Sequence, residues 1–94
     1  MEVPFASRVV VPEHILIRQL DDELVILNMK TEKYLGLDDV GTRMWSALRE
    51  SESIAAAFET LLAEYDVDAE ELRRDLTDLV SRMLEQGLVE LKHD

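Results

Sequence analysis

The chain contains no cysteine and few residues that break regular structure. The absence of cysteine excludes disulfides, thiolate nucleophiles and iron–sulfur ligation, and it removes most structural zinc sites. Only three glycines and two prolines are present, which argues against low complexity. No apolar run approaches the ~18 residues typical of a membrane span, and Glu2 stands where a signal peptide needs a basic residue. A folded chain without a membrane span is predicted, with the cytoplasm as its compartment.

Basic residues are also scarce. Ten Lys and Arg stand against twenty-one Asp and Glu, and the net charge of -11 is shared unevenly. Residues 1–47 carry -3 (five basic, eight acidic) and residues 48–94 carry -8 (five basic, thirteen acidic). Such a surface repels phosphate, so the charge disfavours nucleic acid as a partner and favours a cationic or neutral one. The 94 residues fit one domain with one modest core.

Three short segments in the first half have the patterns of strands. Residues 15–20 alternate loosely with period two, and residues 24–27 form an apolar run too short for a helix. An acidic, turn-forming cluster separates these two segments. Residues 33–37 place Leu35 and Leu37 on one face and Tyr34 with Gly36 on the other. Three consecutive strands of this kind predict an antiparallel meander.

Three amphipathic stretches follow, each preceded by a residue that can cap a helix. Apolar residues recur at helical spacing in all three. The predicted helices begin after Asp38 or Asp39, after Ser53 and after Asp68, and the second and third end near Asp66 and at Gly87. Strands followed by helices indicate an α+β domain, a three-stranded β-meander with three α-helices over residues 14–91.

The two ends of the chain are less regular. Residues 1–13 hold Pro4 and Pro12 between apolar patches, and they are interpreted as an arm, an extra strand or a segment lent to a neighbouring chain. Residues 88–91 are predicted to add a short extended tail, and residues 92–94 to fray.

The residue types that carry catalysis or bind metals do not form a known constellation. His14 and His93 lie near opposite ends of the chain, and neither has a second ligand at i+3 or i+4. The serines lack a glycine-flanked elbow, and the glycines do not form a phosphate loop. We therefore predict no catalytic residue, no metal and no cofactor.

A row of carboxylates on the third predicted helix allows two interpretations. Glu71, Asp75 and Asp78 share one side, where they could hold a cation or act as acid and base. The arginines nearby favour a solvated, ion-paired helix face instead. Ion pairs at i, i+4 spacing are predicted between Glu70 and Arg74 and between Asp78 and Arg82.

The last strand of the predicted meander has an edge whose outward N–H and C=O groups lack partners. Proteins usually protect such an edge with charge, proline or a covering element. Residues 33–37 carry one charge, no proline and Gly36, which permits close backbone approach. Either a loop, the N-terminal arm or a second copy covers this edge, or a guest peptide adds to it as a further strand.

The same region carries the marks of a known family: an aromatic–leucine strand, a carboxylate cap, a small residue and an apolar–Trp pair. In this chain the marks are Tyr34, Leu35, Leu37, Asp38, Asp39, Gly41, Met44, Trp45 and Leu48, followed later by Tyr65, Asp68, Leu72, Leu84, Gly87 and Leu88. Over about residues 14–91 the sequence resembles the PqqD-like family. These are the recognition elements that bind leader peptides of ribosomally synthesised, post-translationally modified peptides (RiPPs).

This resemblance implies a winged-helix-like fold in which the leader adds an antiparallel strand to the third strand and enters a cleft beside the third helix. The implied peptide-binding residues are Lys33, Tyr34, Leu35, Gly36 and Leu37 at the edge and Leu72, Asp75, Leu76 and Leu79 on the cleft wall. A small free-standing chain is similar to the recognition proteins of lasso-peptide pathways, which present a precursor to a leader peptidase and cyclase. The resemblance therefore implies a binding protein and not an enzyme.

Three other functions stay open at this point. A winged-helix fold can place a helix in the DNA major groove, although the acidic third helix is a poor match for phosphate. A PqqD-type peptide chaperone for a radical SAM enzyme is a second alternative. The third is a homodimer in which the arms or the edges at residues 33–37 of two chains pair and leave nothing for a peptide.

Overall fold

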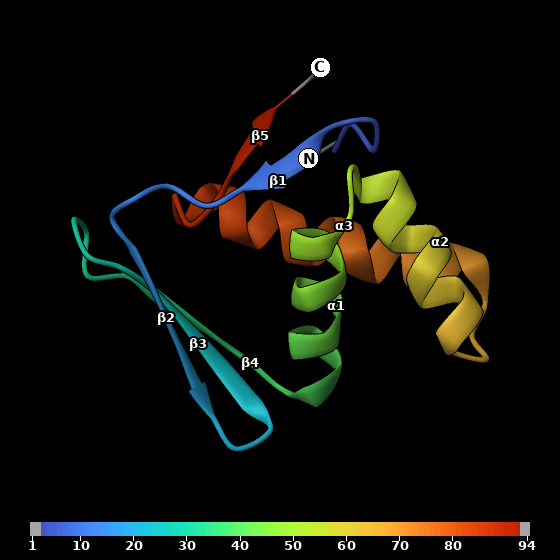
Figure 1. The fold of residues 1–94 in the computed structure, drawn as a ribbon, viewed down its shortest axis with the longest axis horizontal. Helices are drawn as coiled ribbons and strands as arrows, with labels where there is room; N and C mark the ends of the chain where they lie inside the picture. Colours follow the sequence, from blue (N-terminus) through green and yellow to red (C-terminus); the bar gives the residue numbers. More distant parts are fainter. Residues whose placement is uncertain (1–2, 93–94) are drawn as a thin grey trace.

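The computed structural model describes residues 3–92, and its fold is α+β as predicted (Figure 1). The three predicted strands and three predicted helices are all present, and two short strands flank them. In chain order the elements are β1 (Arg8–Val10), β2 (Ile15–Leu20), β3 (Glu23–Asn28), β4 (Tyr34–Leu37), α1 (Asp39–Glu50), α2 (Ile54–Glu64), α3 (Ala69–Glu85) and β5 (Glu90–Lys92).

The meander is an antiparallel sheet with the strand order β2-β3-β4. Its central strand alternates between the core and the open face: Leu24 and Ile26 are buried, whereas Val25 and Leu27 are half-buried. This alternation follows from the two-residue period of a strand. A turn at Asp21, in the left-handed region with φ 55°, joins β2 to β3. Figure 1 shows the sheet extending away from the helices, with β4 leading into α1.

The predicted helix caps are confirmed. Asp38 accepts a hydrogen bond from the Gly41 N–H (2.8 Å), and Ser53 and Asp68 cap α2 and α3 in the same way. Such caps satisfy N–H groups that have no partner within the helix. Helix α2 ends at Glu64, two residues before Asp66, near which its end was predicted, and Tyr65 is already extended (φ -108°, ψ 139°).

The core lies between the three helices and extends to the inner face of the sheet, which α1 contacts at β3 and β4. Its members come from every helix and from β3, which explains why the strands and helices fold as one unit. The largest side chains with no solvent contact include Ile26, Leu48, Ile54, Leu61, Leu76 and Met83. Trp45 is buried in the same cluster, as expected for a core anchor.

The N-terminal segment packs against the helices and pairs with the end of the chain. Strand β1 pairs antiparallel with β5, with Val9 opposite Leu91. The carbonyls of Phe5 and Ser7 accept hydrogen bonds from the first N–H groups of α2, each at 2.8 Å. The Phe5 ring also lies 4.3 Å from the guanidinium of Arg73. Residues 3–10 therefore do not cover β4. Lys92, the first residue of the predicted frayed tail, lies in β5, and His93 and Asp94 lie outside the described residues.

A buried asparagine ties the sheet to α3. The Asn28 side chain is 3% exposed, and its Nδ2 donates to the carbonyls of Gln86 (3.2 Å) and Gly87 (3.3 Å) just beyond α3. Its Oδ1 accepts from the Lys30 N–H in the turn before β4. One side chain thus fixes the start of β4 relative to the C-terminal end of α3.

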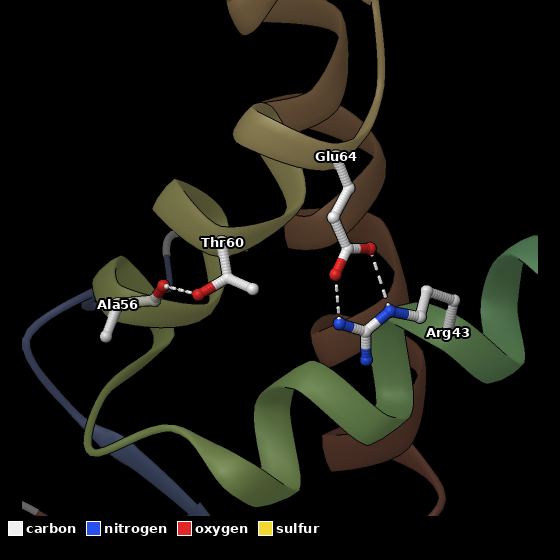
Figure 2. A network of polar contacts seen from close by, with 4 residues as sticks. All are labelled: Arg43, Ala56, Thr60 and Glu64. Atoms are coloured by element: carbon white, nitrogen blue, oxygen red, sulfur yellow. Dashed lines mark hydrogen bonds and ion pairs between the residues drawn. The ribbon is translucent and has the colours of Figure 1, made fainter.

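An ion pair joins α1 to α2 on the surface. Figure 2 shows the Arg43 guanidinium facing the Glu64 carboxylate, with Nε donating to Oε2 at 2.8 Å and a second bond from Nη2 to Oε1. These hydrogen bonds lower the pKa of the Glu64 carboxyl below its ordinary value. Within residues 3–92 this is the one ion pair, so the pairs predicted along α3 are wrong. An exposed pair gains little free energy in water, so i, i+4 spacing alone does not ensure that the two side chains meet.

Candidate functional site

The free edge of β4 exposes two backbone positions. The Asn28 N–H donates to the Lys33 carbonyl (2.8 Å), and the next residue, Met29, donates in the opposite direction to His14 (3.0 Å). Since antiparallel ladders alternate, even-numbered residues of β3 bond towards β4 and odd-numbered residues towards β2. In the observed register, Leu35 and Leu37 therefore bond inward to β3. The N–H and C=O groups of the other two β4 residues, Tyr34 and Gly36, point outward.

The side chains of β4 divide as the sequence predicts. Tyr34 is 67% exposed and Leu37 is 7% exposed, with Leu35 half-buried beside it. Around Gly36, no atom lies within 4 Å of the position that a Cβ would occupy. Lys33 precedes the strand, and its carbonyl already bonds to Asn28. The outward ladder groups at this edge are therefore those of Tyr34 and Gly36.

A hollow surface adjoins the C-terminal end of β4. It consists of a cavity of about 350 Å³ and a second of about 160 Å³, which share Val40, Met44 and Asp75. Together these cavities form what we call the groove, which lies between the β4–α1 junction and α3. The groove residues are Gly36, Leu37, Asp38, Val40, Gly41, Met44, Tyr65, Val67, Glu71, Leu72, Asp75, Leu79 and Arg82.

The structure brings together most of the residues that the resemblance assigned to the cleft. Asp75 lines both cavities, Leu79 lines the larger and Leu72 lines the smaller. Leu76 is fully buried and lines neither cavity, since its position on α3 turns it into the core. Three of the four α3 residues therefore line the groove, and Leu76 lies beneath its surface.

Several groove residues were missed by the sequence interpretation. Val40 and Met44 recur at helical spacing on the apolar side predicted for this helix. Met44 is buried in the core, Val40 is 45% exposed, and both line the two cavities. Arg82 was assigned to an ion pair with Asp78 but lines the larger cavity instead. The sequence held one indication for Val40. It is an apolar residue in the first turn of a helix that directly follows an unprotected strand, so it lies next to the edge of that strand.

The groove combines an apolar floor with charged walls. Met44, Leu72 and Leu79 are nearly covered by neighbouring side chains, whereas the carboxylates of Glu71 and Asp75 are exposed on α3. Such an arrangement suits an extended peptide, because backbone groups can bond to β4 while side chains enter an apolar hollow. Among residues 3–92 no cluster of His, Cys, Asp and Glu could hold a metal ion. None of the described helices has the length and apolar character needed to cross a bilayer.

The opposite edge of the sheet differs from β4. Strand β2 is the other outer strand, and it carries Arg18 and Gln19. The Ile15 N–H on this edge is already bonded to the Pro12 carbonyl (3.3 Å). No β2 residue lines the groove. Of the two outer edges of this sheet, β4 is the one that has a second wall for side chains.

Comparison with known proteins places this chain in a family. The chain matches the family described as "Coenzyme PQQ synthesis protein D (PqqD)" over residues 23–89. None of the curated protein sequences matches the chain.

Two solved structures share the fold. One, described as TbiB1 in complex with the TbiA(beta) leader peptide, is 34% identical with a TM-score of 0.79, covering 90% of this chain and 99% of that chain. Another, described as lasso peptide synthetase B1 complexed with the leader peptide, is 25% identical with a TM-score of 0.77, covering 88% of this chain and 98% of that one. The family match spans β3 to the residues just before β5, and the structural matches span nearly the whole fold. The chain therefore belongs to the PqqD-like family that its sequence resembles.

Proposed function

We propose that this protein recognises the leader peptide of a lasso-type RiPP precursor and binds it by adding a strand to β4. The observation that carries this proposal is the open β4 edge, with Tyr34 and Gly36 directed outward beside the groove. Two similar proteins were solved in complex with leader peptides, which supports the same class of ligand here. The leader would run antiparallel to β4.

The edge and the groove would contribute differently to binding. Ladder bonds to Tyr34 and Gly36 supply affinity with little sequence preference, and the apolar floor at Met44, Leu72 and Leu79 selects side chains. We expect a dissociation constant of roughly nanomolar to micromolar, or about -12 to -8 kcal/mol. Selectivity then depends on the groove more than on the strand.

The protein would act on its pathway without catalysing a step. By holding a disordered leader, it raises the effective concentration of the attached core peptide near a partner enzyme. A leader peptidase, and a cyclase after it, are the partners that such a role requires. The cytoplasm remains the predicted compartment for this encounter.

The competing functions receive less support. A nucleic-acid binder would present a net positive surface on α3. The exposed charges of α3 are three arginines against five carboxylates, on a chain of net charge -11: Arg73, Arg74 and Arg82 against Glu70, Glu71, Asp75, Asp78 and Glu85. A homodimer through two β4 edges would compete directly with the leader. Adding leader should then dissociate the dimer, which a mass measurement in solution with and without peptide detects.

The edge is tested by removing one outward donor. Tyr34→Pro deletes the N–H that would bond to the leader and keeps the inward ladder, so binding of the leader encoded beside this gene should weaken about five- to tenfold. Tyr34→Ala keeps the N–H and serves as the matched control for the lost ring. Titration calorimetry measures both. If folded Tyr34→Pro binds as tightly as Tyr34→Ala, strand addition at this position is wrong.

The groove is tested by placing a charge on its apolar surface. Val40→Asp should weaken leader binding about tenfold, because Val40 lines both cavities and the leader would desolvate the new carboxylate. Leu20→Asp is the control, since Leu20 is 59% exposed at the β2–β3 turn and lines neither cavity. Equal loss in the two variants would show that added negative charge and not the groove is responsible.

A further inference from the structure

The charged side chains along the groove are arranged in order. Glu71 lines the smaller cavity, Asp75 lines both, and Arg82 lines the larger one. In the described part of the chain, no hydrogen bond or ion pair involves any of these three side-chain charges. They lie beside an apolar floor. A charged group on a bound ligand can pair with them there without first breaking a contact within the protein.

The order of these charges gives the groove two electrostatic ends. The negative end lies at Glu71 and Asp75, where the smaller cavity borders α1 and contains no β4 residue. Arg82, the one basic residue among the groove residues, lies in the cavity that reaches Gly36. Besides Asp75, the carboxylate of that cavity is Asp38, which caps α1 by accepting from the Gly41 N–H. Asp75 and Arg82 are seven residues apart on α3, about 10 Å at 1.5 Å per residue. An extended peptide covers that distance in about three residues at about 3.3 Å each. Because successive side chains alternate between faces, two side chains that share a face with a third between them are about four residues apart.

We infer that the groove selects leaders by a pair of opposite charges, and this inference rests on the proposed function. The preferred leader carries a basic side chain against Glu71 and Asp75 and an acidic side chain against Arg82. The two lie about four residues apart on one face of the extended leader, with the apolar side chain midway between them on the floor at Leu79 and Met44. A leader antiparallel to β4 enters from the α1 end, so the basic residue precedes the acidic one.

A charge scan of the leader tests this inference. Each position of the leader encoded beside this gene is replaced in turn by Lys, Gln and Glu, and binding to the full chain is measured. We expect one position that prefers Lys over Glu about two- to tenfold and a second, about four residues later, with the reverse preference. Asp75→Asn should abolish the first preference and Arg82→Gln the second.

Two variants on the same helix control for net charge. Asp78 and Arg74 line a different hollow on α3, together with Glu70, Arg73 and Thr77. Asp78→Asn and Arg74→Gln change the net charge as the groove variants do, so long-range attraction by the acidic chain changes equally. Both controls should keep the two preferences.

The outcomes distinguish a failure of the charge pair from a failure of leader binding itself. If the leader binds but no position distinguishes Lys from Glu, or if the controls alter the preferences as much as the groove variants, the charge pair is wrong and leader binding stands. If no leader binds in any form, the proposed function fails and the charge pair fails with it.

Discussion

Two regions of the molecule expose strands to solvent in different ways. One is the ribbon formed by β1 and β5, and the other is the edge of β4. Each ribbon strand is three residues long, and Arg8, Glu90 and Lys92 place charge along it. Strand β4, with the sequence YLGL, carries no charge and no proline. Short, charged strands are the usual protection against unwanted pairing, whereas an uncharged strand with a glycine accepts another strand. The difference indicates which edge is structural and which is available to a ligand.

The N-terminal segment explains how this difference arises. Its carbonyls bond to the first turn of α2, and Phe5 packs against Phe58 with ring centroids 6.1 Å apart. These contacts hold the segment against the helices, on the side of the molecule away from β4 (Figure 1). The chain therefore stabilises itself with one pair of strands and leaves another strand open.

The largest expected effect tests which β4 groups belong to the fold. Leu35→Pro removes an inward ladder donor from a half-buried position and should lower the free energy of unfolding by about 3 kcal/mol or more. Tyr34→Pro, at an outward position one residue away, should lower it by less than about 1 kcal/mol. Urea denaturation measures both. A larger loss for Tyr34→Pro than for Leu35→Pro would mean that the ladder has the opposite phase and that Leu35 faces the ligand.

A smaller effect compares the two aromatic residues of these regions. Phe5→Ala should cost about 2 kcal/mol of stability, because the ring is half-buried between Phe58 and Arg73. Tyr34→Ala should cost under about 0.5 kcal/mol, since its ring is mostly in solvent. Thermal unfolding distinguishes them. A stability loss at Tyr34 as large as that at Phe5 would show that the edge is part of the folded core.

The smallest expected effect compares two glycines. Gly36→Ala should stabilise the protein by about 0.4 to 1 kcal/mol, because a Cβ there meets no atom within 4 Å and the unfolded chain loses freedom. Gly87→Ala should destabilise it by about 1 kcal/mol, since Gly87 has φ +68° and its Cβ would lie 3.1 Å from Asn28 Nδ2. Denaturant midpoints give the sign of each change. Destabilisation by Gly36→Ala would indicate that the edge needs a glycine for the fold itself.

Most of the fold could be predicted from local patterns. Strand β2 has the predicted bounds, and the caps Asp38, Ser53 and Asp68 mark the three helix starts. Each of these features depends on neighbours within a few residues in the chain. The pairing of β1 with β5 joins the two ends of the chain, and no local pattern encodes it.

The candidate site likewise has some features that local sequence predicts and others that only the folded chain creates. The alternation in YLGL, the missing edge charges and the acidic surface were readable in the sequence, because they depend on residue type and spacing. The outward direction of Tyr34 and Gly36 depends on ladder phase, which the Asn28 and Lys33 pairing sets. The groove depends on how α3 lies against the β4–α1 junction, a placement fixed by the contact of Asn28 with Gln86 and Gly87. Those contacts span almost sixty residues of chain, so Val40 and Arg82 acquire their place beside a ligand only when the chain folds.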